Sequence, residues 1–256
     1  IRIMEMEWID GYDLSRLLAP DILARTRASV NDDRWKHLNN VIVTAGPQQS
    51  RLKPGVAIAI VRECLAALAA LHREGIVHGD IKSSNIIVRT SDHKPVLIDF
   101  GMVRTAIGRT ATQIGALAGT TTHLAPEYIE GDIDHFAASD TYSLGYTLFV
   151  LVTGKPPFEY SKNFADRSMA SQDSELMQLT IQAVPRAPQS LNSNIPDDVA
   201  LVLLRLLDKK PETRMTSVEL EETARHWVKT APLEWDQPFV VPARSNSAPT
   251  RKGAQA

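Results

Sequence analysis

The stretch that decides the fold is Val77-His78-Gly79-Asp80-Ile81-Lys82-Ser83-Ser84-Asn85, which is followed downstream by Asp99-Phe100-Gly101. Two short apolar runs, Ile86-Ile87-Val88 and Val96-Leu97-Ile98, have the length of buried strands. The first run begins directly after the first motif, and the second run leads directly into the second motif. We therefore expect the carboxylates and the amide of the two motifs to converge at the ends of adjacent strands, where they would form a site for a metal ion and a phosphate.

The side chains of these motifs suit phosphoryl transfer. Mg²⁺ binds oxygen ligands and takes one or two of them from the protein, so Asn85 and Asp99 are the candidate ligands for Mg²⁺, or for Mn²⁺ in its place. Asp80 would orient a hydroxyl nucleophile and accept its proton late, because phosphoryl transfer depends mainly on positioning and on charge stabilisation. Lys82 would place a positive charge beside the phosphoryl group.

At this point the sequence resembles the serine/threonine protein kinases. Residues 78–85 resemble the catalytic loop H-R-D-x-x-x-x-N, residues 99–101 the D-F-G motif, and Ala125-Pro126-Glu127 the A-P-E motif. Lys82 stands two positions after Asp80, as in the serine/threonine branch. The resemblance implies that the γ-phosphoryl group of ATP, held with Mg²⁺, is transferred to a Ser or Thr hydroxyl of a protein substrate.

The resemblance also assigns the nucleotide site, most of it to the start of the chain. Met6 would be the gatekeeper, and the backbone groups of Glu7 and Ile9 would meet the adenine. Asp13 would lie near the ribose. Ile87 would form the floor of the adenine site.

Further residues take supporting roles by the same resemblance. Thr120 would hydrogen-bond the catalytic Asp and Lys, and His78 would pack against Phe100 and bond the backbone rather than act as a base. Gly79 replaces the Arg of the family motif, which can pair with a phosphate added to the activation segment. We therefore expect activity not to require phosphorylation of that segment.

Two charged groups are expected to hold the lobe together. Asp140, in the first turn of an apolar helix, would hydrogen-bond the backbone of the catalytic loop. Arg214 would form an ion pair with Glu127 of the A-P-E motif. Breaking a buried pair of this kind costs roughly 3–5 kcal/mol.

The predicted fold is mainly α with a small β component, namely a kinase C-terminal lobe preceded by only the last strand and the hinge of the N-terminal lobe. We assign residues 1–12 to that strand and hinge, with a turn at Asp10-Gly11, and residues 13–230 to the C-terminal lobe. Within the lobe, residues 30–54 are predicted to be an inserted loop and 99–127 the activation segment. Helices are expected at 56–73, 175–184, 196–207 and 217–228, with a loop at 160–172. Residues 231–256 are expected to be a disordered tail or linker.

Neither a glycine-rich phosphate-covering loop nor a strand lysine precedes the predicted hinge within this sequence. Two explanations stay open: a longer parent protein supplies the N-terminal lobe in cis, or the protein lacks it, and we favour the first. In both cases the chain of 256 residues is expected, by itself, to bind ATP weakly and to turn over little.

Two other functions remain as alternatives. A pseudokinase or scaffold lobe would bind partners without catalysis. A small-molecule phosphotransferase is suggested by the His-Gly-Asp triplet, which resembles that of the aminoglycoside and choline phosphotransferases. The A-P-E motif and the predicted roles of Asp140 and Arg214 favour a protein kinase over the small-molecule enzymes.

Composition limits the partners and the compartment. The net charge of −2 gives no general electrostatic reason to bind nucleic acid or an anionic membrane. The unbroken apolar runs are far shorter than the roughly twenty residues of a membrane-spanning helix, so we expect no span. The single cysteine, Cys64, cannot form an internal disulfide, which indicates a reducing, cytoplasmic environment.

Overall fold

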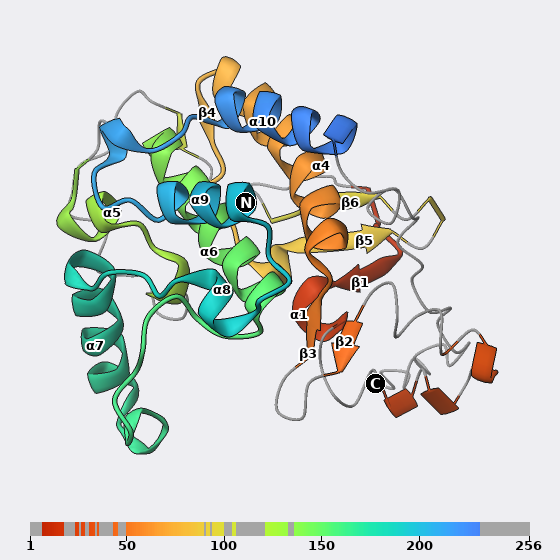
Figure 1. Ribbon diagram of the computed structural model, residues 1–256. Coiled ribbons are helices and arrows are strands. Elements are labelled where there is room, and N and C mark those ends of the chain that lie inside the picture. Colours follow the sequence, from red (N-terminus) through yellow and green to blue (C-terminus); the bar gives the residue numbers. More distant parts are fainter. Residues whose placement is uncertain are drawn as a thin grey trace, which may run out of the picture.

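The computed structural model describes residues 7–17, 24–25, 27–28, 31–33, 35, 43–45, 50–89, 91–92, 94–99, 104–105, 121–132 and 136–230. Helices dominate and pack around α6 (Phe136–Thr153), which lies between α4 (Pro54–Arg73) and α9 (Asp197–Leu206), as Figure 1 shows. Short strands lie at one side of this helical body. The arrangement agrees with the predicted helical lobe carrying a small β component.

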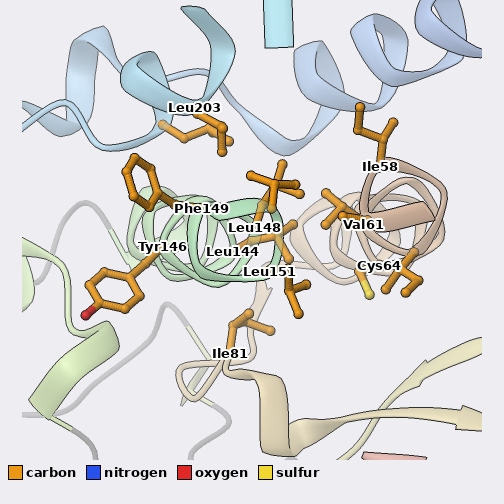
Figure 2. Packing of buried hydrophobic residues seen from close by; sticks show 14 of the residues in the cluster. Ile58, Val61, Cys64, Ile81, Leu144, Tyr146, Leu148, Phe149, Leu151 and Leu203 are labelled. Carbon is orange, nitrogen blue, oxygen red and sulfur yellow. The ribbon is translucent and has the colours of Figure 1, made fainter. Parts of the chain in front are cut away.

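Helix α6 is the centre of the hydrophobic core. Its Leu144, Leu148 and Leu151 are almost completely buried. In Figure 2, Leu148 lies on the side of α6 that faces Val61 of α4 and Leu203 of α9, and Leu151 points toward Ile81. A helix that is apolar all round belongs in the interior, because no side of it favours water. A Cβ on Gly145 would lie 2.5 Å from the Cβ of Leu206. Glycine therefore permits the close approach of α6 and α9.

Helix α4 begins at Pro54 and ends before Gly75, close to the predicted bounds. Proline is favoured in the first helical turn, and Gly75 takes φ 67°, a left-handed conformation that suits glycine. By length and composition α4 could cross a membrane, with a mean hydropathy of 1.8 over its best window. This segment is not an unbroken apolar run in the sequence, because Arg62 and Glu63 interrupt it. More than half of that window, 56%, is buried, and α4 packs against α6 and α10 (Ser217–Thr230).

A three-stranded antiparallel sheet contains Asp13 and Ile87 of the predicted nucleotide site. Its strand order is β1 (Gly11–Asp13), β5 (Ile86–Arg89), β6 (Pro95–Leu97). The bounds of β5 and β6 agree to within one residue with the two apolar runs that were predicted to be strands. The turn predicted at Asp10-Gly11 is wrong at Gly11, because β1 begins there, opposite Arg89. A Cβ on Gly11 would lie 2.4 Å from Ile87 Cγ2 and Val88 O. Gly11 therefore permits a close strand approach rather than a turn.

The region predicted as an inserted loop contains a hairpin. Strands β2 (Val43–Ala45) and β3 (Ser50–Leu52) pair antiparallel, Leu52 is fully buried, and Arg51 Nη1 donates to Leu191 O at 2.9 Å. Strands of three residues are too short to show alternation in the sequence. The prediction of a plain loop over 30–54 is therefore wrong for this part.

The remaining elements complete the helical body. They are α1 (Leu14–Leu17), α5 (Pro126–Glu130), α7 (Met169–Gln182) and α8 (Pro188–Leu191), with β4 (Ile76–Val77) paired to β7 (Arg104–Thr105). Helix α7 begins within the stretch predicted as a loop, because Ser168 caps its first turn by accepting a hydrogen bond from Ser171 N. Helices α9 and α10 lie where helices were predicted.

Candidate functional site

The catalytic loop is held from one side by Asp140 of α6. The chain leaves β4, passes through residues 78–82 and forms a 3₁₀ turn at Ser83–Asn85 before entering β5. The carboxylate of Asp140 accepts hydrogen bonds from His78 N and Gly79 N, both at 2.8 Å. Gly79 has φ 78°, so the loop turns sharply at this anchor through a conformation that favours glycine. The structure therefore contains the backbone contact that was predicted for Asp140.

Asp80, Lys82 and Asn85 form one polar cluster. Asp80 Oδ2 accepts hydrogen bonds from Lys82 Nζ at 2.7 Å and from Asn85 Nδ2 at 2.9 Å, and Asn85 Nδ2 also donates to Asp80 O at 2.8 Å. Both acceptors lack hydrogens to donate, so the amide must direct its nitrogen toward Asp80. Asn85 Oδ1 is therefore turned away from Asp80, as a cation ligand would require.

Asp99 lies at the same end of the β5–β6 hairpin as Asn85. Ile98 N donates to Asn85 O at 3.0 Å, which extends the pairing of Ile86 with Leu97 by one step. Asp99 is exposed and has φ 64°, the one positive φ at a non-glycine residue in the described part of the chain. Such strained backbone clusters at functional sites.

The donor set fits a hard cation. Among the described residues no group of three or more His, Cys, Asp or Glu side chains is placed to hold a metal. A cation here would therefore depend on Asn85 Oδ1 and Asp99, with phosphate and water completing its shell, which is how Mg²⁺ is usually bound.

The predicted nucleotide residues are partly brought together. Asp13 pairs directly with Ile87 across β1 and β5, and Ile87 lies on the face of β5 opposite the buried Ile86 and Val88. Asp13 Oδ1 also accepts a hydrogen bond from Arg16 N at 2.9 Å and so caps α1. Glu7 is exposed and Ile9 half-buried in an irregular segment.

Several predictions fall on residues that the structure does not describe. These are Met6, Phe100, Thr120, most of the activation segment, and the tail 231–256. His78 itself is fully buried, and its Nδ1 accepts a long hydrogen bond of 3.4 Å from Asp80 N. This contact agrees with backbone bonding by His78.

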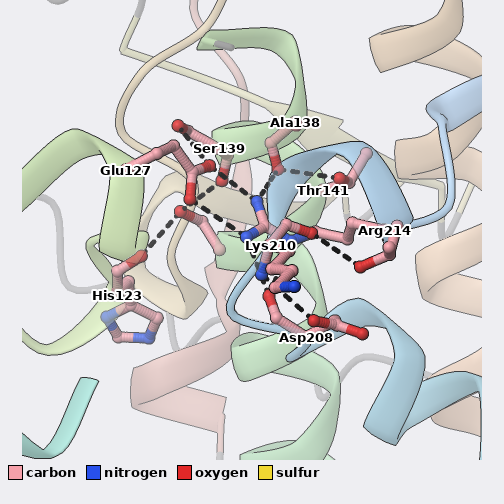
Figure 3. A network of polar contacts seen from close by, with 10 residues as sticks. His123, Glu127, Ala138, Ser139, Thr141, Asp208, Lys210 and Arg214 are labelled. Carbon is pink, nitrogen blue, oxygen red and sulfur yellow. Dashed lines mark hydrogen bonds and ion pairs between the residues drawn. The ribbon is translucent and has the colours of Figure 1, made fainter. Parts of the chain in front are cut away.

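The predicted ion pair between Arg214 and Glu127 is present and buried (Figure 3). Nη1 lies 2.6 Å from Oε1 and Nη2 lies 3.0 Å from Oε2, with the side chains 0% and 2% exposed. The remaining guanidinium hydrogens go to Ala138 O and Asp208 O, and Ser139 Oγ donates to Glu127 Oε1 at 2.8 Å. All five N–H groups of Arg214 therefore have an acceptor.

His123 is a residue near Asp80 and Lys82 that was not predicted from the sequence. Its ring centroid lies 4.7 Å from that of Tyr146, Nδ1 lies 2.8 Å from Thr122 Oγ1, and Ser143 Oγ donates to its carbonyl. Burial, followed by the charge of Lys82, lowers the pKa of His123 to about 4, while Asp80 acts in the opposite direction. His123 is therefore a neutral ring within the electrostatic reach of the catalytic loop. No motif in the sequence identifies it, because its neighbours come from other segments.

Comparisons with known proteins agree with this geometry. The family model described as "Protein kinase domain" matches residues 26–228. The chain is 33% identical over 187 residues to serine/threonine-protein kinase PknB of Mycobacterium tuberculosis, covering 72% of this chain and 27% of the relative. It is 32% identical over 176 residues to serine/threonine-protein kinase PkaA of Streptomyces coelicolor, covering 68% of this chain and 30% of the relative. The chain thus spans less than a third of the length of these relatives.

A solved structure of the Rad53 kinase domain and SCD2 in complex with AMPPNP has a similar fold. The TM-score is 0.57 at 20% identity, and the match covers 93% of this chain and 73% of that chain. At this identity the likeness concerns the fold alone. The family match over residues 26–228, however, includes the loop of residues 78–85, the A-P-E motif and most of α10. The chain therefore belongs to the protein kinase domain family.

Proposed function

We propose that the polypeptide containing this chain is an ATP-dependent protein kinase that phosphorylates serine or threonine in a protein substrate. The observation that carries the proposal is the arrangement of Asp80, whose Oδ2 binds both Lys82 and Asn85. This leaves Oδ1 of the same carboxylate to accept a hydrogen bond from a substrate hydroxyl. The names of the relatives, all serine/threonine-protein kinases, support the class of substrate.

In this mechanism Asp80 orients the hydroxyl and takes its proton as the hydroxyl oxygen bonds to the γ-phosphorus of ATP. The bond from that phosphorus to the oxygen bridging the β- and γ-phosphates breaks, and ADP leaves. Lys82, 2.7 Å from Asp80, offers positive charge to the transferred group. Asn85 and Asp99 would hold Mg²⁺, which supplies charge neutralisation at the phosphates when bound. Ile87 and Asp13, paired across the sheet, would contact the nucleotide base and ribose, with Glu7 and Ile9 lending backbone groups.

The test uses the natural polypeptide that contains this chain. Phosphate transfer from γ-labelled ATP to casein is measured with Mg²⁺ for wild type and for Asp80→Asn, Asn85→Ala and Asp99→Asn. Each variant is expected to lose at least about 10²-fold in kcat, because each removes positioning or charge stabilisation. Glu212→Gln, an exposed carboxylate in the short turn Pro211–Thr213, is the matched control and should retain activity. Full activity of Asp80→Asn would refute the mechanism.

The two alternative functions, a pseudokinase and a small-molecule phosphotransferase, predict different results in the same assay. A pseudokinase would bind ATP, yet its background turnover would be unaffected by Asp80→Asn. A small-molecule phosphotransferase would label an aminoglycoside or choline and leave casein unlabelled. The chain of residues 1–256 by itself is expected to show little turnover, and a robust Mg²⁺-dependent rate from it, abolished by Asp80→Ala, would contradict that expectation.

The proposed location is the cytoplasm. It rests on Cys64, which is free and 1% exposed in α4, together with the absence of any second cysteine in the sequence. Fractionation of the source cells with an antibody against this lobe tests the proposal. Recovery of the lobe outside the cytoplasmic fraction would contradict it.

A further inference from the structure

A half-buried lysine joins three segments at the end of α7. Lys209, in the segment after α9, donates from Nζ to Thr180 O at 2.6 Å, and Nζ lies 4.2 Å from the centroid of the Phe158 ring. Thr180 and Phe158 are each 2% exposed, and Lys209 itself is half-buried. Figure 1 shows α7 at the edge of the helical body. Lys209 therefore connects this outlying helix with the segment that leads to Arg214.

Two contacts hold the side-chain nitrogen of Lys209 in place. Thr180 lies in the last turn of α7, where carbonyls lack amide donors within the helix and attract positive charge. The face of the Phe158 ring also attracts a cation. Both contacts favour the ammonium form, and both keep Nζ at this junction.

Two other features oppose the charge on Lys209. Burial removes water from the ammonium group, and the guanidinium of Arg214 repels it, while Asp208 acts in the opposite direction. Arg214 Nη2 donates to Asp208 O at 2.8 Å, which keeps the guanidinium beside this segment (Figure 3). The net result lowers the pKa of Lys209 to about 8. Lysines that are desolvated or lie beside a second cation are the ones that act as nucleophiles in proteins.

We propose that Lys209 is a site of acylation by a small activated acyl donor of the acyl phosphate class. The uncharged Nζ attacks the carbonyl carbon of the donor and forms a C–N bond, while the bond from that carbon to the phosphate oxygen breaks. Inorganic phosphate leaves, and one hydrogen of the amine goes to solvent as a proton. The inference is independent of the proposed kinase function, because it uses none of the residues assigned to phosphoryl transfer.

Acylation would weaken the attachment of α7. The product has no positive charge for the Phe158 ring and the end of α7 to attract. Its amide can still donate one hydrogen bond to Thr180 O, but the added acyl group needs space beside two residues that are nearly fully buried. We therefore expect the last turn of α7 to separate from the segment after α9 when Lys209 is acylated.

The first experiment treats the natural polypeptide that contains this chain with acetyl phosphate at pH 7.5 and follows each lysine by mass spectrometry. About a quarter of Lys209 is uncharged at this pH, against about 0.1% of an ordinary lysine with a pKa near 10.4. After allowance for partial shielding, Lys209 should be acetylated at least about tenfold faster than its exposed neighbour Lys210. Equal rates at the two lysines overturn the proposal.

Two changes of condition test the cause of this preference. The rate at Lys209 should level off above about pH 8, because the amine is then mostly uncharged. A rate at Lys209 that still rises tenfold per pH unit up to pH 10 overturns the proposal. In guanidinium chloride, where the fold is lost, Lys209 and Lys210 should react at equal rates, and a preference that persists there overturns it too.

The second experiment measures hydrogen exchange of the amides in the last turn of α7. Exchange should accelerate about two- to tenfold in the acetylated protein and in Lys209→Gln, which has lost the charge, since a lost part-buried contact has this order of effect. It should hardly change in Lys209→Arg, which keeps a cation and its donors, or in Lys210→Gln, the matched control at the exposed neighbour. Unchanged exchange after acetylation, or equal acceleration in Lys210→Gln, refutes the link between Lys209 and α7.

Discussion

The buried pair of Arg214 and Glu127 gives the sharpest test of what holds this lobe together. The perturbation is a double-mutant cycle with Arg214→Met, Glu127→Met and the double variant. Arg214→Met leaves the 2%-exposed carboxylate of Glu127 with Ser139 Oγ as its one remaining donor among the described residues. Glu127→Met leaves a guanidinium that is 0% exposed with two backbone carbonyls as its acceptors.

The magnitudes follow from these environments. Each single variant leaves one buried charge without its partner, which costs roughly 3–5 kcal/mol. The double variant leaves no unpaired charge. Its loss of stability comes mainly from the carbonyls of Ala138 and Asp208, which no longer have the guanidinium as a donor, at about 1–3 kcal/mol each. The double variant should therefore lose about 4 kcal/mol less than the sum of the single variants.

Equilibrium unfolding in urea, followed by circular dichroism, measures all four proteins. Single domains are stable by only about 5–15 kcal/mol, so the single variants are best measured at low temperature. The pair of Arg167 and Glu175, with Nη1 and Oε2 2.9 Å apart and side chains 38% and 15% exposed, is the control. Because this pair is more accessible to water, Arg167→Met should have a much smaller effect than Arg214→Met. If the two single losses simply add in the double variant, the buried pair has no coupling and the reasoning is refuted.

Three further perturbations test other parts of the structure. Gly145→Ala places a Cβ 2.5 Å from Leu206 Cβ and should lower the free energy of unfolding by about 1–3 kcal/mol, seen as a lower Tm; an unchanged Tm would contradict the close packing of α6 and α9. His123 has a pKa of about 4 in the folded protein, so the unfolded chain binds a proton first as pH falls below about 6.5. Between pH 6.5 and 4 the free energy of unfolding of wild type should therefore fall by up to about 3 kcal/mol relative to that of His123→Phe. Parallel pH profiles of the two proteins would show that the ring is not buried in its neutral form. Burial raises the pKa of the Cys64 thiol to about 12, so Ellman's reagent should label Cys64 only as fast as the protein unfolds, and fast labelling of the native protein would place the thiol at the surface.

The local parts of the site could be predicted from the sequence. Asn85 and Asp99 flank apolar runs that form β5 and β6, because a short apolar run between polar residues has few other stable conformations. Helix α4 was predictable because its buried residues repeat at helical spacing over 20 residues. The contacts of Asp140 and Arg214 with residues distant in the sequence were predictable only through the resemblance to kinases, since their partners lie 62 and 87 positions away in the chain.

Other features leave no local signal. His72 Nδ1 lies 2.9 Å from Ser217 Oγ although the two residues are 145 positions apart in the sequence, and each by itself has the appearance of an ordinary helix-end residue. His123 has an environment made by Tyr146 and Lys82, which no spacing rule connects to it. The start of β1 at Gly11 was missed because glycine serves both tight turns and close strand contacts, and only the position of Ile87 decides between them.

The first two turns of α6 connect the catalytic loop with the segment that carries the A-P-E motif. Asp140 bonds the loop, while its neighbours Ser139 and Ala138 bond Glu127 and Arg214. One turn later, Ser143 donates to the carbonyl of His123. The rest of α6 is mainly apolar and mainly buried, so a shift of the helix within the core would break close packing. Asp80 and the segment 121–127 are therefore positioned by one rigid element, and a substitution that moves the start of α6 should disturb both together.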